Sequence, residues 1–175
     1  MTTTKRTTTT KRKSTTAKKP AAKKTTPKVT LGPNSRVDEI LSVVSSERTK
    51  AKKVATLQSY NENFLKSILI WNFDDSIKSD LPPGEVPLSN SEDREVTATN
   101  LRKEWNKLYN FVKGGNDSMN RLRKETMFIN ILEQLHPKEA EVLVLVKDKN
   151  LSSKYNVTRE LVEEAYPDIQ WGGRS

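Results

Sequence analysis

From residue 35 to residue 166, apolar residues recur at intervals of three and four, which is the spacing of the buried side of a helix. Val37, Ile40 and Val44 show this spacing in the first such segment. The pattern predicts an all-α fold, a small bundle of about six or seven helices. The predicted helices begin near residues 35, 49, 61, 93, 118, 137 and 158.

Particular residues mark the ends of these helices. Ser35, Ser118 and Thr158 are suited to cap helix N-termini, because a side-chain oxygen accepts a hydrogen bond from a free backbone N–H. Pro137 fits the first turn of the sixth helix, where no backbone N–H is needed. The fourth helix is expected to cover residues 93–112, because a Gly-Gly pair follows shortly after.

One segment fits two kinds of secondary structure. Residues 142–146 are five consecutive apolar residues, three of them Val, and such a run also suits a buried strand. A helix ending near residue 147 is favoured, because no partner strand is predicted elsewhere in the chain.

The large apolar residues indicate which helix faces form the core. Trp71 and Trp105 lie on apolar faces and are expected to be buried. The fifth helix is expected to bury a broad stripe that extends from Leu122 to Leu135. Trp171 is a candidate for an exposed ring that stacks on a base.

Charge and composition divide the chain into three parts: residues 1–34, 35–170 and 171–175. Residues 1–30 hold ten basic residues and no acidic ones, whereas the remainder holds 21 basic residues and all 22 acidic ones. The tail, residues 1–34, thus carries a charge of +10 against −1 for the rest of the chain, which together give the net charge of +9, and it is rich in Lys and Thr. We expect the tail to be disordered, residues 35–170 to be the helical domain, and residues 171–175 to be flexible.

Ten cations without a single anion favour binding to a polyanion. Phosphate contacts carry no sequence information, so the tail predicts binding to nucleic acid regardless of base sequence, with DNA and RNA equally suitable. A solubilising tail, or a localisation signal at Lys11-Arg12-Lys13, is the alternative. The ten cations are Lys5, Arg6, Lys11, Arg12, Lys13, Lys18, Lys19, Lys23, Lys24 and Lys28.

Basic residues also gather where predicted helices meet. Lys113-Gly114-Gly115 precedes the predicted fifth helix. Near the start of that helix come three more basic residues, Arg121, Arg123 and Lys124. A second junction extends from Lys147 to Lys154. Glycine allows close approach to a phosphate, and a helix N-terminus attracts anions. The alternative is that these side chains are solvated surface and that Gly114 only ends a helix.

Several kinds of chemistry find no support in the chain. There is no Cys and one His, so no metal site built on these residues is expected, and no cofactor-binding motif is present. The acidic pairs, Asp74-Asp75 among them, are expected to face solvent, and His136 is expected to be a cap or a surface residue. We therefore expect a protein that is not an enzyme. No apolar segment is long enough to span a membrane, and the basic N-terminus lacks the apolar stretch of a secretory signal.

Residues 35–169 resemble the N-terminal DNA-binding domain of the ATP-dependent DNA ligases of T-even bacteriophages. The closing segment also resembles a family of small tailed-phage proteins without an assigned function. The first resemblance is carried by Val37–Val44, Asn61–Lys66, Glu139–Leu151, Val157 and Leu161–Ile169, and the second by Phe111–Gly115, Lys147–Lys149 and Tyr166-Pro167.

The ligase resemblance implies a domain that holds duplex DNA along the minor groove by backbone contacts at helix–loop–helix corners. Carried over to this chain, it points to Lys147, Lys149 and Lys154, and less directly to Lys113, Gly114 and Gly115. Ser152-Ser153 stands where the ligases have glycine. The Lys-x-Asp-Gly motif of ligase catalysis is missing, so ligase activity is not expected.

Together these features predict an accessory DNA-binding protein of a tailed phage, located in the host cytoplasm or nucleoid or packaged in the virion. Its expected partner is double-stranded DNA, with RNA as a possibility. The alternative is an adaptor or virion structural protein, in which the folded part binds a phage or host protein such as a polymerase or capsid and only the tail contacts nucleic acid. The near-neutral charge of residues 31–175 favours this alternative.

Overall fold

The computed structural model describes residues 1–2, 31–87 and 97–173. Within these residues the secondary structure is helical, with an isolated bridge between Ser79 and Val112, which confirms the predicted all-α bundle. The helices are α1 (Val37–Ser46), α2 (Lys50–Ser59), α3 (Asn63–Phe73), α4 (Leu101–Glu104), η1 (Trp105–Phe111), α5 (Arg121–Gln134), α6 (Pro137–Lys147), η2 (Leu151–Ser153) and α7 (Arg159–Ala165), of which η1 and η2 are 3-10 helices.

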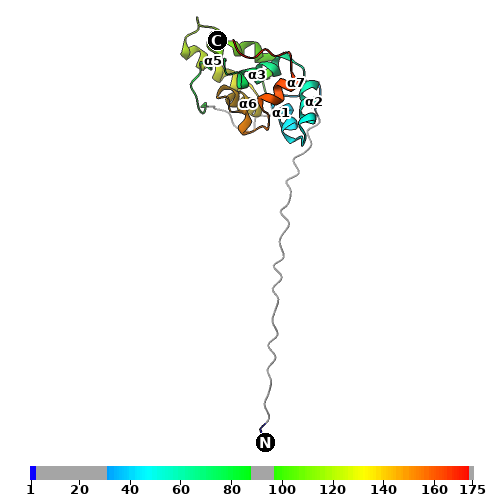
Figure 1. Ribbon diagram of the computed structural model, residues 1–175. Helices are drawn as coiled ribbons and strands as arrows, with labels where there is room; N and C mark the ends of the chain where they lie inside the picture. Colours follow the sequence, from blue (N-terminus) through cyan, green and yellow to red (C-terminus); the bar gives the residue numbers. More distant parts are fainter. Residues whose placement is uncertain (3–30, 88–96, 174–175) are drawn as a thin grey trace.

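Helix α6 lies at the centre of the bundle and packs against α1, α3 and α5 (Figure 1). Val142, Leu143 and Val146 are completely buried, because the helix has neighbours on several sides. This position explains the continuous apolar run, which a helix exposed on one side would not need. The choice of helix over strand for residues 142–146 is confirmed.

Helices α2 and α7 pack together beside α1 at one end of the bundle (Figure 1). Thr158 caps α7, as predicted, since its hydroxyl accepts a hydrogen bond from the N–H of Leu161. The buried hydroxyl of Tyr166 lies 2.6 Å from the carbonyl oxygen of Leu57 and 2.9 Å from that of Tyr60. It thereby joins the C-terminal ends of the two helices.

The first helix begins one residue later than predicted. Arg36 is the N-cap of α1, and its backbone N–H donates to the Glu39 carboxylate at 2.9 Å. Ser35 instead closes the preceding turn, where its hydroxyl accepts a hydrogen bond from the N–H of Gly32 at 2.8 Å. The tyrosine hydroxyl of Tyr60 donates to the carbonyl oxygen of Gly32, so this turn is fastened to the helical domain.

The predicted fourth helix, residues 93–112, is wrong in its extent. Of the described residues in that range, 97–100 are not helical, and Asn100 caps the short α4. The chain then continues as η1, in which Trp105, Leu108 and Phe111 are spaced by three. A 3-10 helix has three residues per turn, so this spacing brings all three side chains to one face.

Helix α5 also starts later than predicted, because Asn120 and not Ser118 caps it. The Ser118 hydroxyl bonds the side chain of Asn116 in the preceding loop. Leu122 was expected in the buried stripe but is 74% exposed. Phe128, Ile131 and Leu132 further along the helix are buried as predicted.

The connection after α3 is held in place by Asp74, which is buried. Its carboxylate accepts hydrogen bonds from Ser76 and, at 2.9 Å, from the backbone N–H of Gly172. The expectation that Asp74 faces solvent is therefore wrong, whereas the Asp75 side chain is 91% exposed. Trp171 lies against the Arg159 guanidinium at 4.9 Å, so the start of the C-terminal segment contacts the domain.

Candidate nucleic-acid interface

The ten tail cations, from Lys5 to Lys28, lie outside the described residues. Their role in binding a polyanion stays a prediction. The structure does describe both basic junctions between helices, and the two differ in how far their basic side chains are exposed.

Lys147 was predicted to contact phosphates, but its side chain is only 1% exposed. Its ammonium donates to the carbonyl oxygens of Pro82 and Gly84 at 2.9 and 3.1 Å and lies 2.5 Å from the Asp148 carboxylate. Three oxygen partners satisfy the three donors of a lysine ammonium. The prediction is corrected: Lys147 fastens the connection around residues 82–84 to the end of α6.

Lys149 has a similar internal role. Its ammonium donates to the carbonyl oxygen of Asp74 at 2.6 Å, and the side chain is half-buried. Its backbone adopts a φ of 55°, so the left-handed residue of this corner is Lys149 and not one of Ser152-Ser153. Lys149 is therefore placed to shape the turn after α6, and its phosphate contact stays a prediction.

Lys154 is the exposed member of the three lysines predicted at this corner. It forms an ion pair with Glu141, and the two side chains are 43% and 47% exposed. Such a surface pair contributes little to stability, so its lysine can exchange one anionic partner for another. The predicted contact of Lys154 with a phosphate thus stays open.

The junction between η1 and α5, residues 112–121, presents its predicted residues at the surface. Lys113, Gly114, Gly115 and Arg121 are all exposed. Arg121 pairs with Glu125 at 2.8 Å, but its side chain remains 68% exposed. We call this region the η1–α5 corner. It is the more accessible of the two predicted basic junctions.

Glycine is needed at the two positions of the corner, 114 and 115, for different structural reasons. Gly114 has a φ of 77°, which other residues adopt only with strain. Gly115 packs so closely on η1 that a Cβ atom there would overlap the carbonyl oxygen of Tyr109. Glycine at 115 therefore allows the loop to fold back on η1, and close approach to a phosphate is not needed to explain it.

The structure adds Lys78 to this corner, a residue that the sequence analysis did not select. The N–H of Lys113 donates to the carbonyl oxygen of Lys78 at 2.9 Å, next to the bridge between Ser79 and Val112. Lys78 and Lys113 are exposed, and neither forms an ion pair with another described residue. Lys78 lies in a connection without periodicity, so only the pairing with residues 111–113 reveals its place.

Lys124, which follows Arg121 and Arg123 in the sequence, does not belong to the exposed set. Its side chain is 1% exposed, and its ammonium lies 2.7 Å from the Asp80 carboxylate. This ion pair joins α5 to the connection that carries Lys78.

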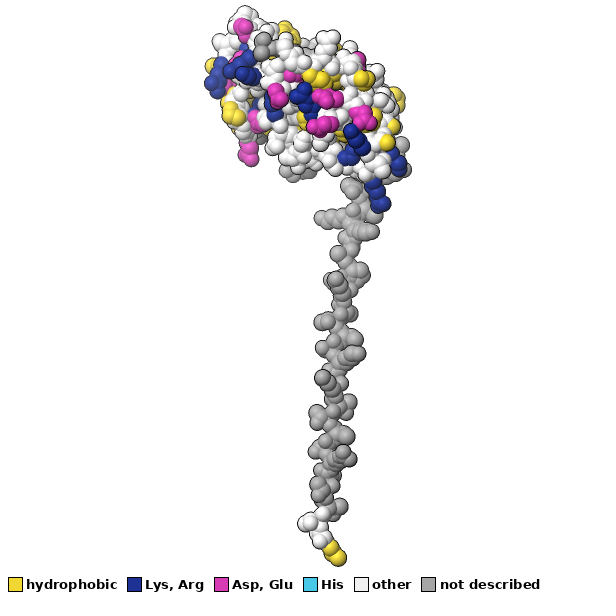
Figure 2. Space-filling model, viewed as in Figure 1, with side chains coloured by type: hydrophobic (Ala, Val, Ile, Leu, Met, Phe, Trp, Pro, Cys, Tyr) yellow, Lys and Arg dark blue, Asp and Glu magenta, His cyan; other side chains and the backbone are white. Residues whose placement is uncertain are grey.

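Figure 2 shows Lys and Arg side chains gathered at the left edge of the folded part, where Figure 1 places α5. Elsewhere on this face, basic and acidic side chains alternate.

Glu139 is a buried carboxylate at the junction of three helices, and its pKa is raised to about 7. Burial is the main cause, and the nearby Asp38 carboxylate adds to it. Hydrogen bonds from the backbone N–H groups of Val37 and Leu101 and the charge of Arg36 act in the opposite direction. Oxygen Oε2 of Glu139 has no hydrogen-bond partner among the described residues.

The raised pKa of Glu139 predicts a stability that falls with rising pH. Between pH 4.5 and about 7 the folded state binds this proton more tightly than the unfolded state, so the free energy of unfolding decreases across that window. Glu139→Gln should remove this dependence. The variant should be more stable than the wild type by about 2 kcal/mol at pH 8 and similar to it at pH 5. Urea unfolding at both pH values measures this difference, and an equal difference at both would contradict it.

His136 caps α6, which confirms its predicted place as a cap. Its Nδ1 accepts a hydrogen bond from the N–H of Lys138 at 3.2 Å. Burial lowers the pKa of His136, and the neighbouring Arg36 contributes, so the ring stays an acceptor.

In residues 31–87 and 97–173, no three His, Asp or Glu side chains are grouped to hold a metal ion. No helix in this part of the chain is long and apolar enough to cross a bilayer.

Comparison with known proteins assigns the folded part to a family. Residues 40–153 match DUF6433, a family of unknown function. The chain belongs to the DUF6433 family. The match includes the η1–α5 corner and most of the bundle, and it leaves out the tail and α7. No curated protein matches the chain, and no solved structure does. For this DUF6433 protein, the likeness to a ligase DNA-binding domain stays a prediction from sequence.

Proposed function

We propose that this DUF6433 protein is a non-enzymatic DNA-binding protein that holds the phosphate backbone regardless of base sequence. One observation carries the proposal: residues 1–30 contain ten cations and no anion, whereas the other 145 residues are nearly neutral. A chain that concentrates its charge in this way releases many counterions when it binds a polyanion. RNA offers the same phosphates and is an equally suitable ligand for the tail.

The η1–α5 corner supports a second, weaker contact. Lys78 and Lys113 in the corner, and Arg123 in the adjoining first turn of α5, are exposed and form no ion pairs with other described residues. Cations that have no internal partner can approach a phosphate without first losing one. Together with the likeness to ligase DNA-binding domains, this corner suggests an accessory protein of a tailed phage that works on DNA in the host cytoplasm or nucleoid, or in the virion.

A second candidate function is that of an adaptor whose folded part binds a phage or host protein. The near-neutral charge of residues 31–175 favours it, because a dedicated DNA-binding domain is usually basic by itself. In this case only the tail would contact nucleic acid.

Charge reversal in the corner separates the two candidates. Lys113→Glu combined with Arg123→Glu should lower the affinity of the full chain for a 30-bp duplex about tenfold if the corner contacts DNA, because repulsion replaces two attractions. Lys52→Glu combined with Arg48→Glu, at the opposite end of the bundle, is the matched control. Fluorescence anisotropy on duplexes of three unrelated sequences shows both whether the corner contacts DNA and whether binding depends on base sequence. Equal losses in both double variants favour the adaptor, and a strong preference for one sequence contradicts sequence-independent binding.

A further inference from the structure

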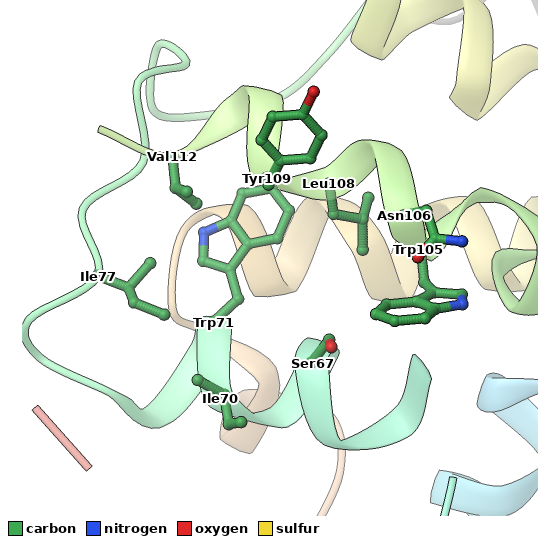
Figure 3. Close-up of a pocket in the computed structure, with 9 residues that line it drawn as sticks. All are labelled: Ser67, Ile70, Trp71, Ile77, Trp105, Asn106, Leu108, Tyr109 and Val112. Carbon is green, nitrogen blue, oxygen red and sulfur yellow. The ribbon is translucent and has the colours of Figure 1, made fainter. Parts of the chain in front are cut away.

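A groove of about 490 Å³ lies between α3, η1 and the connection after α3. Its nine lining side chains are uncharged and largely apolar. Figure 3 shows the Trp71 indole in the middle of this group, with Tyr109 and Leu108 from η1 beside it and Trp105 across the groove. Ile77 and Val112 line the opposite end.

Two aromatic rings of this groove reach the surface. Tyr109 is 55% exposed, and Trp105 is partly exposed where it packs against the core. Exposed aromatic rings are stacking platforms for unpaired bases, since every base has a flat π-face. In Figure 3 the two rings project to different sides of η1, and Tyr109 is the one that lies beside Trp71.

Trp71 contributes a polar group that lacks a partner. The residue is 3% exposed, and its indole N–H makes no hydrogen bond within the described chain. In Figure 3 the ring nitrogen lies on the side of Ile77 and Val112. Buried indole N–H groups usually have an acceptor, so this one indicates a ligand that brings an oxygen to this end of the groove.

Positive charge lies at the same end. Lys78 directly follows Ile77, and Lys113 directly follows Val112, and a backbone hydrogen bond of 2.9 Å joins the two lysines. Both side chains are exposed and have no acidic partner among the described residues. An apolar aromatic groove with free cations at its rim is complementary to a base that is linked to phosphates.

We propose that this groove holds one unpaired base of a single-stranded nucleic acid. The base stacks on Tyr109, an acceptor atom of the base accepts the Trp71 N–H, and the flanking phosphates lie beside Lys78 and Lys113. A base in a duplex is already stacked and paired, so it does not enter such a groove unless it is extruded. Every base offers an acceptor for this N–H, which is a carbonyl oxygen in thymine, uracil, guanine and cytosine and a ring nitrogen in adenine. This inference rests on the proposed function, because the tail supplies most of the affinity.

A comparison of strands with and without bases tests the groove separately from the tail. The full chain is titrated with a 12-mer of thymidine and with an abasic 12-mer that has the same phosphates, using fluorescence anisotropy. We expect roughly five- to 100-fold tighter binding of the thymidine strand. Tyr109→Ala should abolish that preference and leave the affinity for the abasic strand unchanged. Leu122→Ala removes another exposed apolar side chain, which does not line the groove, and should keep the preference.

Trp71→Phe keeps a ring in the core but removes the N–H, so it should reduce the preference for the thymidine strand over the abasic strand. If this variant fails to fold, Tyr109→Ala still decides the question. Equal binding of thymidine and abasic strands by the wild type overturns the groove inference alone and leaves the proposed function standing. A preference that survives Tyr109→Ala also overturns it. Failure to bind any strand overturns both the inference and the proposed function.

Discussion

Replacing all ten basic residues of the tail with Gln should weaken binding to a 30-bp duplex by at least about 1000-fold at 50 mM salt. The reason is electrostatic: these ten residues carry more positive charge than the net charge of the whole chain, which is +9. Without them the remaining chain has no net positive charge to release counterions from DNA. Fluorescence anisotropy with the full-length variant measures the loss.

The matched control keeps the composition of the tail and scrambles its order. If charge alone matters, the scrambled tail should bind as well as the natural one, because phosphate contacts depend on charge and reach rather than on sequence. Thermal unfolding should be unchanged in both variants if the helical domain carries the stability. A ten-Gln variant that binds within about fivefold of the wild type would place the DNA contacts in the folded part.

Lys147→Met should destabilise the fold by about 3 kcal/mol and should not be interpreted as a loss of DNA contacts. The substitution removes a buried ammonium and leaves the carbonyl oxygens of Pro82 and Gly84 and the Asp148 carboxylate without their donor. Breaking a buried charged contact by removing one partner typically costs several kcal/mol, because the other partner stays desolvated. Urea unfolding of wild type and variant gives the difference in free energy.

Lys154→Met is the control from the same corner. Its ion pair with Glu141 is about half exposed, so its loss should cost less than about 1 kcal/mol. Similar losses of stability in both variants would mean that the burial of Lys147 does not hold in solution. Comparing the two variants also guards the DNA-binding experiments against misinterpretation, because a charge reversal at Lys147 would reduce DNA binding simply by unfolding the protein.

The helices of this fold could largely be predicted from the sequence, because periodic apolar positions and capping residues are local signals. Thr158 caps α7 as expected, and Pro137 lies in the first turn of α6. The break in the fourth helix was missed because Trp105, Leu108 and Phe111 fit an α-helix and a 3-10 helix almost equally well.

The candidate site was harder to predict, since burial of a charged residue depends on contacts that are distant in sequence. Lys124 and Lys147 were assigned to the surface as basic residues usually are, but Asp80 and the Pro82 and Gly84 carbonyls lie against them. The groove likewise requires the pairing of Ser79 with Val112, which no local pattern indicates. Tyr109 lies on the exposed side of a helix that the sequence did not predict in this form.

The salt dependence of duplex binding tests the central claim most directly. The affinity of the full chain for a 30-bp duplex is measured from 50 to 300 mM salt, alongside the ten-Gln variant. If the tail holds the phosphates, the log–log slope of the wild type should be steeper than about −5 and approach −9 as all ten cations engage, and the variant should lose most of that slope. Equal slopes in the two proteins would contradict the account.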